Sequence, residues 1–576
     1  MASAWTCPFA TAALSIALNS SEETWRTEIN DIFEQAEVRY PDIIWMIRGG
    51  DRYLDTFWGH KAILHARASS FSTKYPLLRS ASEMGSLLQS RARIVPTAPT
   101  EAGTTLRVPI TNSALLAEHL NYLYTGRMGA KPELVFDTGR FEPDVEAETH
   151  ERLRKELLNM WRSGAYNDVR IIPTEESPSP RKSKQAVVAF FSGHRFILAS
   201  RVPFLRTLLS ASTPTGRTIS STNPLLLNLP SPPFTPACLY FVLGFIYTGT
   251  LSFSDRNWDL ETAFNILCSA KYLRLDTLEH EIRARIVADM AHGLFHAYLP
   301  SKEYNDIIQA SRETTSGCLC EQCRQNVLGI LEFALRDDVR DDVRDDILER
   351  GARRALSKIH AFGEAWTTSE FMALPMWSKR ILLEDVKAQT TPRSLLGLLQ
   401  ATRAGLVNLE SNSEPGAKSV KNLIIEEQSR IDEVLCNSLG ELFEQPEWVA
   451  VLHNSAMGPG EMDTFEMVME SIGRGLSDAN IGHVYQTLAS AVLSRPDLKA
   501  GNALFSNDSM QQTRAEQLRA DVIGWMRRQW TIMRMSTPYQ GLDPWALEQG
   551  KLTSRFDVVT TTTRGPSVDI IQASRA

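Results

Sequence analysis

The sequence is poor in cysteine, and its charges are nearly balanced. It has seven cysteines in 576 residues, and four of them stand alone (Cys7, Cys238, Cys268 and Cys436). An odd and scattered set does not make a disulfide framework. The 61 basic and 68 acidic residues give a net charge of −7, so neither nucleic acid nor an anionic membrane is expected as a partner. Unpaired thiols fit a reducing compartment, and we expect a cytoplasmic or nuclear protein.

Long apolar runs and common catalytic motifs are also missing. No run approaches the roughly 20 apolar residues that span a bilayer. The apolar stretch 9–18 has no basic residue before it and is interrupted by Thr11 and Ser15, so we expect no signal peptide. The sequence has no His-Glu-x-x-His, no Gly-x-Ser-x-Gly, no phosphate-binding loop and no dinucleotide fingerprint. We therefore expect that the protein is not an enzyme.

The sequence does contain a repeated order of predicted elements. In the first copy, two strands and a short helix precede a third strand and an amphipathic helix, at 42–47, 53–58, 60–71, 106–110 and 115–124. The same order returns about 130 residues later, at 168–172, 186–191, 194–204, 225–229 and 237–247. Each copy ends in Tyr-Thr-Gly, where the glycine predicts the end of a helix. The chain therefore contains an internal repeat.

The residues that define the repeat resemble the BTB/POZ domain. Both copies have an Asp at the first strand, then His-Lys/Arg-x-x-Leu-x-x-Arg, then the Tyr-Thr-Gly helix end. The second copy continues into 270–278, which resembles the closing helices of that domain, whereas the first lacks an obvious closing pair. The chain thus resembles a tandem BTB/POZ protein of the fungal type. In that family the Asp and the basic residue form a charged pocket at a dimer interface. The resemblance implies partner or dimer contacts at Asp42, His60, Lys61, Asp168, His194 and Arg195.

Residues beyond 325 are predicted to be almost wholly helical. Apolar residues recur at helical spacing in 326–335, 347–359, 377–386, 394–409, 420–443, 466–476, 481–493 and 511–533. The segment 361–375 resembles part of the BACK-like helical domain that often follows a BTB domain. No Kelch-type repeat or zinc-finger array follows it, so the usual substrate-binding modules of such proteins are missing.

Cys318, Cys320 and Cys323 form the sharpest local motif. Three thiols in six residues can supply three ligands to a structural zinc ion, with His292 or His296 as the fourth. The alternative is a loop of free thiols, because no second cysteine pair lies nearby. The sequence leaves both interpretations open.

The sequence predicts an α+β fold class, with two BTB/POZ-like modules followed by an all-α C-terminal region. The boundaries we expect are an N-terminal extension (1–24), a truncated first module (25–135), a helical linker (136–165), a second module with disordered insertions (166–295), a junction holding the cysteines (296–325), a BACK-like helical region (326–555) and a disordered tail (556–576).

The resemblance implies a protein–protein interaction adaptor that associates through its BTB modules, as a homodimer or by pairing within one chain. Many such proteins are substrate adaptors of cullin-based ubiquitin ligases. Cullin-binding members usually carry a hydrophobic-x-Glu element after the helix that follows the His motif, and the second copy reads Leu-Leu-Ser-Ala-Ser there, at 208–212. A scaffold or regulatory oligomer without a ligase link is the alternative. A DNA-linked regulator is disfavoured because no basic DNA-binding module is visible.

Overall fold

The structure is a computed structural model of the full chain. It describes residues 8–49, 52–67, 104–108, 113–127, 146–175, 189–212, 219–310, 318, 320–335, 345–453, 459–494 and 510–528. The chain divides into two compact units, Met1–Gly351 and Ala352–Ala576. Each unit is treated by itself below.

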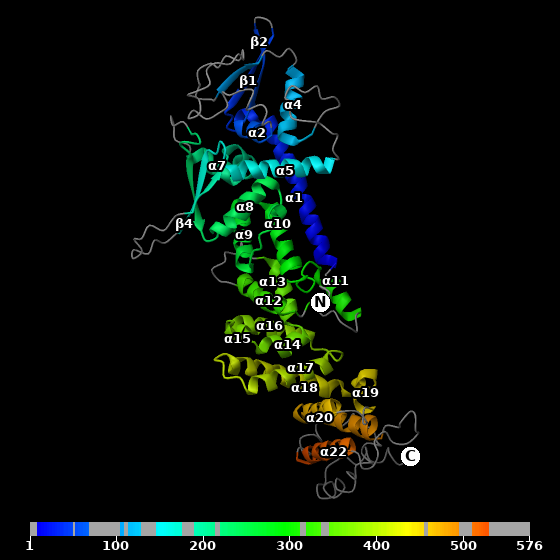
Figure 1. Ribbon diagram of the computed structural model, residues 1–576. Helices are drawn as coiled ribbons and strands as arrows, with labels where there is room; N and C mark the ends of the chain where they lie inside the picture. Colours follow the sequence, from blue (N-terminus) through cyan, green and yellow to red (C-terminus); the bar gives the residue numbers. More distant parts are fainter. Residues whose placement is uncertain are drawn as a thin grey trace, which may run out of the picture. The chain divides into compact units, whose positions relative to one another are not determined.

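In its described residues the first unit has two three-stranded sheets of the same topology; both lie in the N-terminal part of the chain (Figure 1). In each sheet the central strand pairs antiparallel with the strand after it and parallel with a later strand. The first sheet has the order β2-β1-β3, with β1 at Ile43–Gly49, β2 at Arg52–Gly59 and β3 at Thr104–Val108. The second has the order β5-β4-β6, with β4 at Val169–Glu175, β5 at Phe191–Gly193 and β6 at Leu225–Ser231. The internal repeat predicted from the sequence is confirmed at the level of topology.

Each sheet follows a long leading helix and is accompanied by shorter helices. In the first repeat these are α1 (Pro8–Glu34), a 3-10 turn η1 (Ala36–Val38), α2 (Lys61–Arg67) and α4 (Ser113–Thr125). In the second they are α5 (Glu146–Ser163), α6 (Arg195–Arg201), α7 (Pro203–Ser212) and α8 (Pro236–Thr248). The chain continues through η3 (Leu251–Phe253), α9 (Leu260–Leu273), α10 (Asp276–Arg285), a π-helical turn η4 (Ile286–Met290), α11 (Ser301–Ala310), α12 (Glu321–Ala334) and α13 (Asp346–Leu356).

The helix α8 shows how the sequence fixes these elements. Thr235 accepts a hydrogen bond from the Cys238 N–H, and Pro236 occupies the first turn, which is a favourable N-terminus. Gly249 ends the helix in the left-handed conformation, with φ of 72°. Ten of the thirteen residues of α8 are buried, because α5, α9 and η3 pack around it. On β6, alternate residues are buried, as expected for a strand with one covered face.

The second unit is all helical in its described residues. Its helices are α14 (Ile359–Glu364), η5 (Ala365–Thr367), α15 (Ser369–Ala373), α16 (Met376–Gln389), α17 (Leu395–Glu410), α18 (Ala417–Leu442), α19 (Pro446–His453), α20 (Pro459–Arg474), α21 (Ile481–Thr487), a π-helical turn η6 (Leu488–Leu493) and α22 (Met510–Arg528). Trp366 is fully buried, stacks on Phe371 and donates to the Leu356 carbonyl. The predicted helical character of this half is confirmed.

Several predicted boundaries fall inside helices or packed segments. The division at residue 24 falls inside α1, which is one continuous helix, and the division at 325 falls inside α12. The segment 136–165 is more than a linker, because α5 packs against α2 and α8. The strand predicted at 186–191 overlaps the short β5 only at Phe191, and residues 186–188 lie outside the described part of the chain. Residues 176–188 and 213–218, where the second module was expected to hold disordered insertions, and the whole of the expected tail lie outside the described residues.

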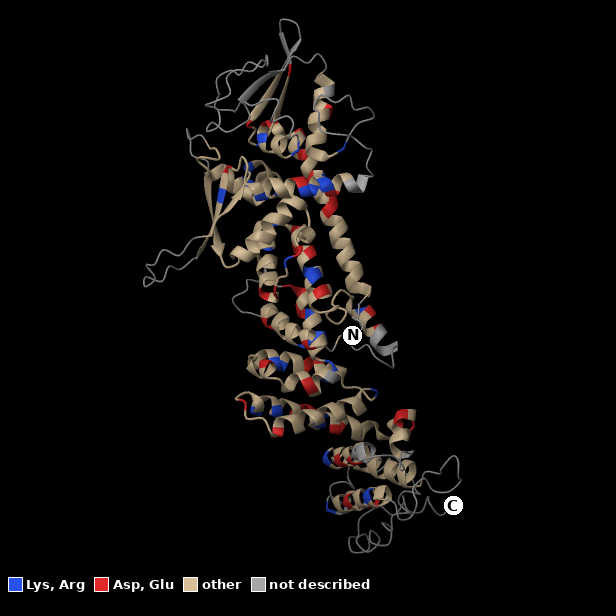
Figure 2. Cartoon of the chain, viewed as in Figure 1, with Lys and Arg blue, Asp and Glu red and all other residues tan. Residues whose placement is uncertain are grey.

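No helix in the described part of the chain is long and apolar enough to cross a membrane. Figure 2 shows basic and acidic residues interspersed along the helices, with both signs close together on α5.

Candidate functional site

Each repeat holds a buried histidine with a complete set of hydrogen bonds. In the first repeat the His60 backbone N–H donates to the Tyr124 hydroxyl at 2.9 Å, and that hydroxyl lies 2.8 Å from Nδ1 of the His60 ring. Nε2 lies 2.7 Å from the Arg39 carbonyl oxygen. A carbonyl only accepts, so Nε2 carries the proton and Nδ1 accepts from Tyr124. The ring is therefore neutral with both nitrogens occupied.

The second repeat reproduces this arrangement. The His194 backbone N–H donates to the Tyr247 hydroxyl at 3.0 Å, which lies 2.7 Å from Nδ1, and Nε2 lies 2.9 Å from the Ala165 carbonyl oxygen. Burial lowers the pKa of His60 to about 4 and also lowers the pKa of His194. Both imidazoles are thus uncharged at neutral pH, in agreement with their hydrogen bonds.

The predicted Asp and basic residues lie beside these histidines. Asp42 Oδ1 accepts the Lys61 backbone N–H at 2.7 Å, and Asp168 Oδ1 accepts the Arg195 backbone N–H at the same distance. Each carboxylate therefore receives an otherwise unsatisfied donor at the first turn of α2 or α6. Arg195 Nε also donates to Asp168 Oδ2 at 2.6 Å. Burial raises the pKa of Asp42 to about 6, and the nearby Asp168 contributes to the rise.

The surface around His60 in the first repeat contacts the surface around His194 in the second. The His60 ring stacks on Phe196 of the other repeat, with centroids 4.0 Å apart and planes 13° apart. The Arg195 guanidinium lies 4.6 Å from the centre of the Tyr40 ring, and the Tyr40 hydroxyl lies 3.3 Å from Ser210 Oγ. Of the six residues predicted to line a dimer interface, His60 and Arg195 therefore contact the other repeat within this chain.

A pair of tyrosines makes reciprocal contacts across this interface. Tyr40 and Tyr166 each stand two residues before the Asp of their repeat, and both have positive φ, 56° and 60°. This is an uncommon conformation for a bulky residue. Tyr40 reaches Arg195 and Ser210 of the second repeat, and the Tyr166 ring lies 5.7 Å from His65 of the first. The contacts are reciprocal, as expected for a pseudo-twofold arrangement of the two repeats.

Two buried arginines connect each repeat to the leading helix of the other. Arg67 donates to the Leu123 carbonyl at 2.7 Å near the end of α4, and pairs with Glu156 of α5 at 2.8 Å. Arg201 donates to the Ile246 carbonyl at 2.9 Å near the end of α8, and pairs with Glu28 of α1. Both side chains are 2% exposed, so each ion pair is largely shielded from water. Burial lowers the pKa of Arg201 to about 9.

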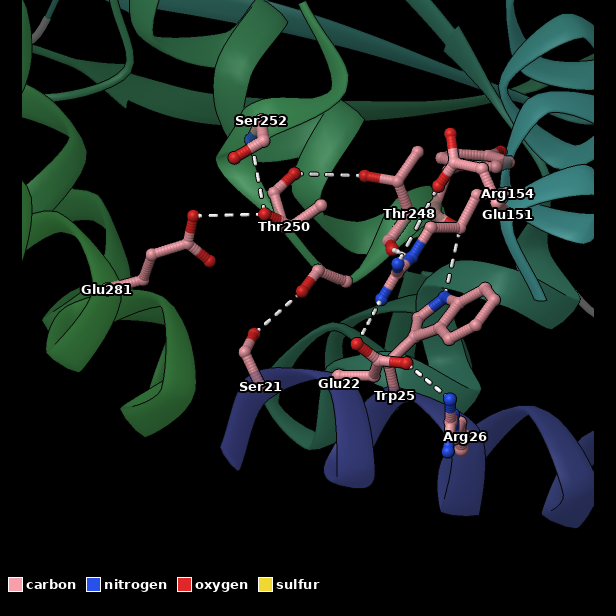
Figure 3. A network of polar contacts seen from close by, with 12 residues as sticks. Ser21, Glu22, Trp25, Arg26, Glu151, Arg154, Thr248, Thr250, Ser252 and Glu281 are labelled. Atoms are coloured by element: carbon pink, nitrogen blue, oxygen red, sulfur yellow. Dashed lines mark hydrogen bonds and ion pairs between the residues drawn. The ribbon is translucent and has the colours of Figure 1, made fainter. Parts of the chain in front are cut away.

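The helix α1 also contacts the Tyr-Thr-Gly end of the second repeat directly (Figure 3). Trp25 Nε1 donates to the Tyr247 carbonyl at 3.0 Å, and Ser21 Oγ donates to the Gly249 carbonyl at 2.7 Å. Arg154 of α5 donates to the Thr248 carbonyl at 3.0 Å and lies 3.4 Å from a Glu22 carboxylate oxygen. The carbonyls that a helix end leaves unsatisfied are thus used to join α1, α5 and α8.

The sequence did not reveal these helix contacts. The first module predicted from the sequence begins at residue 25, but no pattern links Trp25 to the second repeat. No pattern links the hydroxyls of Tyr124 and Tyr247 to the histidines either. The repeated Tyr-Thr-Gly is the sequence feature that could have indicated the role of these tyrosines, because the same residues at both helix ends suggest a shared function. Only the long-range packing shows that the hydroxyl serves the histidine.

The predicted cysteine cluster is brought together with one histidine. Nδ1 of His292 lies 3.2 Å from Sγ of Cys318, 3.6 Å from Sγ of Cys320 and 3.2 Å from Sγ of Cys323. All four ligand atoms lie within 4.8 Å of one another. The ring of His296, the other predicted ligand, instead lies 5.8 Å from the Phe9 ring. The structure therefore selects His292 from the two candidates.

Comparison with known proteins identifies one part of the chain. The model of the BTB/POZ domain matches residues 186–289, which run from β5 through α10 into η4. No curated protein matches the chain. The second repeat thus contains a BTB/POZ domain, a type of domain that mediates protein–protein interactions. The match does not extend to the first repeat or to the helical second unit.

Proposed function

We propose that this chain is a protein–protein interaction adaptor in which the first repeat is a divergent BTB module that pairs with the BTB/POZ domain of the second repeat. The observation that carries the proposal is the stacking of His60 on Phe196, with matching histidine and Asp groups on both sides. The pairing occupies the face that two separate chains would otherwise use to dimerise. The protein would therefore be a monomer with the architecture of a dimer.

Covalent linkage favours such internal pairing. Two modules on one chain meet at an effective concentration in the millimolar range when the linker allows it, so they outcompete a second chain at ordinary concentrations. The crossed contacts of Arg67 and Arg201 add to this preference, since each buried guanidinium would lose its carboxylate if the repeats separated.

A double-mutant cycle across the interface tests the pairing. The Tyr40→Ala and Arg195→Ala variants each remove one partner of the cation–π contact, and the double variant removes both. We expect a coupling energy of about 0.5–1 kcal/mol in urea unfolding. The Asp168 contact of Arg195 cancels in the cycle, because Tyr40 does not take part in it. A coupling energy of zero would refute the internal interface.

The histidine and Asp groups are proposed as structural, and no catalytic role is assigned to them. A general base needs a free lone pair within reach of substrate. Both nitrogens of His60 and of His194 are already engaged, and both side chains are buried.

The second unit is proposed as a BACK-like helical region that holds a partner. Two partner classes follow from this arrangement. A helical region directly after a BTB domain favours a substrate adaptor of a cullin-based ubiquitin ligase. The absence of a hydrophobic-x-Glu element at the end of α7, which closes at Ser212, favours a scaffold without a ligase link.

A binding assay separates these two classes. The purified full-length chain is titrated with the N-terminal region of a cullin, and a known BTB adaptor serves as the positive control. Binding at micromolar concentration supports the ligase adaptor. No binding, with the positive control intact, leaves the scaffold as the function.

A further inference from the structure

The donor atoms around His292 are those that zinc prefers. The cluster offers one imidazole nitrogen and three cysteine sulfurs, and it includes no carboxylate. Soft sulfur and imidazole ligands favour zinc, whereas calcium, magnesium and manganese favour oxygen. Four ligands of this kind form a closed structural site, with no open position for catalysis.

The distances within the cluster fit a metal at its centre. Zn–S bonds of about 2.3 Å and a Zn–N bond of about 2.0 Å in tetrahedral geometry place nitrogen and sulfur roughly 3.6 Å apart. The observed separations of His292 Nδ1 from the three sulfurs are 3.2, 3.6 and 3.2 Å. A single ion would therefore reach all four atoms without a rearrangement of the backbone.

The backbone holds the ligands in place from both sides. Residues 292–296 all have positive φ, between 33° and 98°, so His292 begins a left-handed turn that is strained for its four non-glycine residues. The buried Leu294 and Phe295 anchor this turn. On the other side, Cys320 caps α12 and accepts the Cys323 N–H at 3.4 Å. Asn326 of α12 donates to the Met290 carbonyl at 2.7 Å, which joins the two segments.

We propose that His292, Cys318, Cys320 and Cys323 bind one structural zinc ion that fastens the turn after the BTB/POZ domain to the start of α12. The ion would fix the point at which the matched domain, which ends at residue 289, gives way to the helices that follow. Metal binding would also stabilise the left-handed turn, because the ion binds only the conformation in which His292 lies beside the three thiols.

Disulfide formation explains the cluster less well. One disulfide would use two of the three cysteines, and it would not account for the position of the third sulfur and the His292 nitrogen beside them. The other described cysteines, Cys238, Cys268 and Cys436, lie outside the cluster, so they offer no fourth thiol. Only a metal uses all four donors.

Metal analysis of the full-length chain tests the proposal. The wild-type protein, purified without chelator under reducing conditions, is expected to carry about one zinc ion per chain, and the His292→Ala and Cys320→Ser variants to retain below about 0.2. The matched controls are His296→Ala, from the same turn, and Cys268→Ser, a thiol outside the cluster. Both controls should keep the wild-type zinc content.

A second readout guards against variants that fail to fold. The wild-type chain is depleted with a chelator and reloaded with Co²⁺, which should give the intense thiolate-to-metal absorption of a tetrahedral site. Wild-type protein that takes up neither zinc nor cobalt refutes the site. Equal zinc loss in the controls, or an unchanged cobalt spectrum in His292→Ala, refutes the assignment of these four ligands. Intact mass under non-reducing conditions detects a disulfide, which would also overturn the proposal.

Discussion

The first and second repeats build the same contacts around a buried histidine, although the BTB/POZ model matches only the second. His60 and His194 have equivalent partners: a tyrosine hydroxyl, a backbone carbonyl and a neighbouring Asp-capped helix. The comparison teaches that the same contacts can form in a repeat whose sequence the family model does not match. A face that is buried within the chain continues to require its hydrogen bonds, because each unsatisfied buried group is costly.

The repeats differ most in how tightly the leading helix of the partner packs on them. A Cβ added at Gly249 would lie 2.5 Å from Trp25 Cβ, whereas one at Gly126 would lie 3.1 Å from Thr149 Cγ2. Both glycines have φ of 72°. The second repeat therefore accepts α1 more closely than the first accepts α5.

The largest expected effect comes from removing one of the crossed arginines. Arg201→Ala leaves Glu28 without its buried partner, and Arg67→Ala leaves Glu156 paired only with the exposed Arg152. Loss of one member of a buried pair costs about 3–5 kcal/mol, and we expect both variants to lose stability in this range in urea unfolding. Arg152→Ala is the matched control, because Arg152 also pairs with Glu156 but is 54% exposed, and it should lose below about 0.5 kcal/mol. A large difference between the free energies of unfolding lost in Arg67→Ala and in Arg201→Ala would show that the two ion pairs are not equivalent.

The glycine substitutions sharpen the comparison. Gly126→Ala should cost about 1 kcal/mol, because alanine disfavours positive φ. Gly249→Ala should cost about 2–4 kcal/mol, because crowding against Trp25 adds to that strain. Thermal unfolding of the two variants side by side measures the difference. Equal losses would show that α1 does not lie against Gly249 in solution.

The pH dependence of stability is the smallest predicted effect. Burial lowers the pKa of His60 to about 4, and the pKa of His194 is lowered too, so the unfolded chain binds more protons than the folded chain below pH 6.5. Stability that these residues confer is therefore lost as the pH falls from about 6.5 toward 4. Asp42 acts in the opposite direction: its pKa is raised to about 6, so stability is gained as the pH falls through that value.

Two histidines outweigh one carboxyl group, and the net result is lower stability at pH 5 than at pH 7. Asp42→Asn removes the opposing contribution, so this variant should lose more stability than the wild type over the same interval. Urea unfolding at the two pH values measures both proteins. A smaller loss in Asp42→Asn than in the wild type would contradict the assigned direction of the Asp42 shift.

Local patterns predicted most of the elements but few of the long-range contacts. The hairpin 42–58 and the helices of the second half were found because apolar periodicity and turn residues are local signals. Cys318, Cys320 and Cys323 were found because their spacing suits a metal. The choice of His292 over His296 was not accessible, since both have suitable spacing and the left-handed turn depends on the packing of Leu294 and Phe295.

The sequence left two alternatives open, a homodimer and the pairing of the two repeats within one chain. The resemblance implies a dimer face at Asp42 and Asp168, but no local pattern indicates which surface contacts which. The contact between Ser21 and Gly249 joins residues 228 positions apart, and such a contact follows from tertiary packing alone. The predicted boundary at residue 24 falls inside α1 for the same reason, since the contacts of α1 with the second repeat are not visible in its own sequence.

Sedimentation equilibrium of the full-length chain tests the central claim most directly. If the two repeats pair internally, the protein has the mass of one chain, 64.5 kDa, across the micromolar range, because its dimer face is already occupied. A concentration-dependent shift to twice that mass, abolished in a Phe196→Asp variant, would show that the same face joins two chains and would contradict the account.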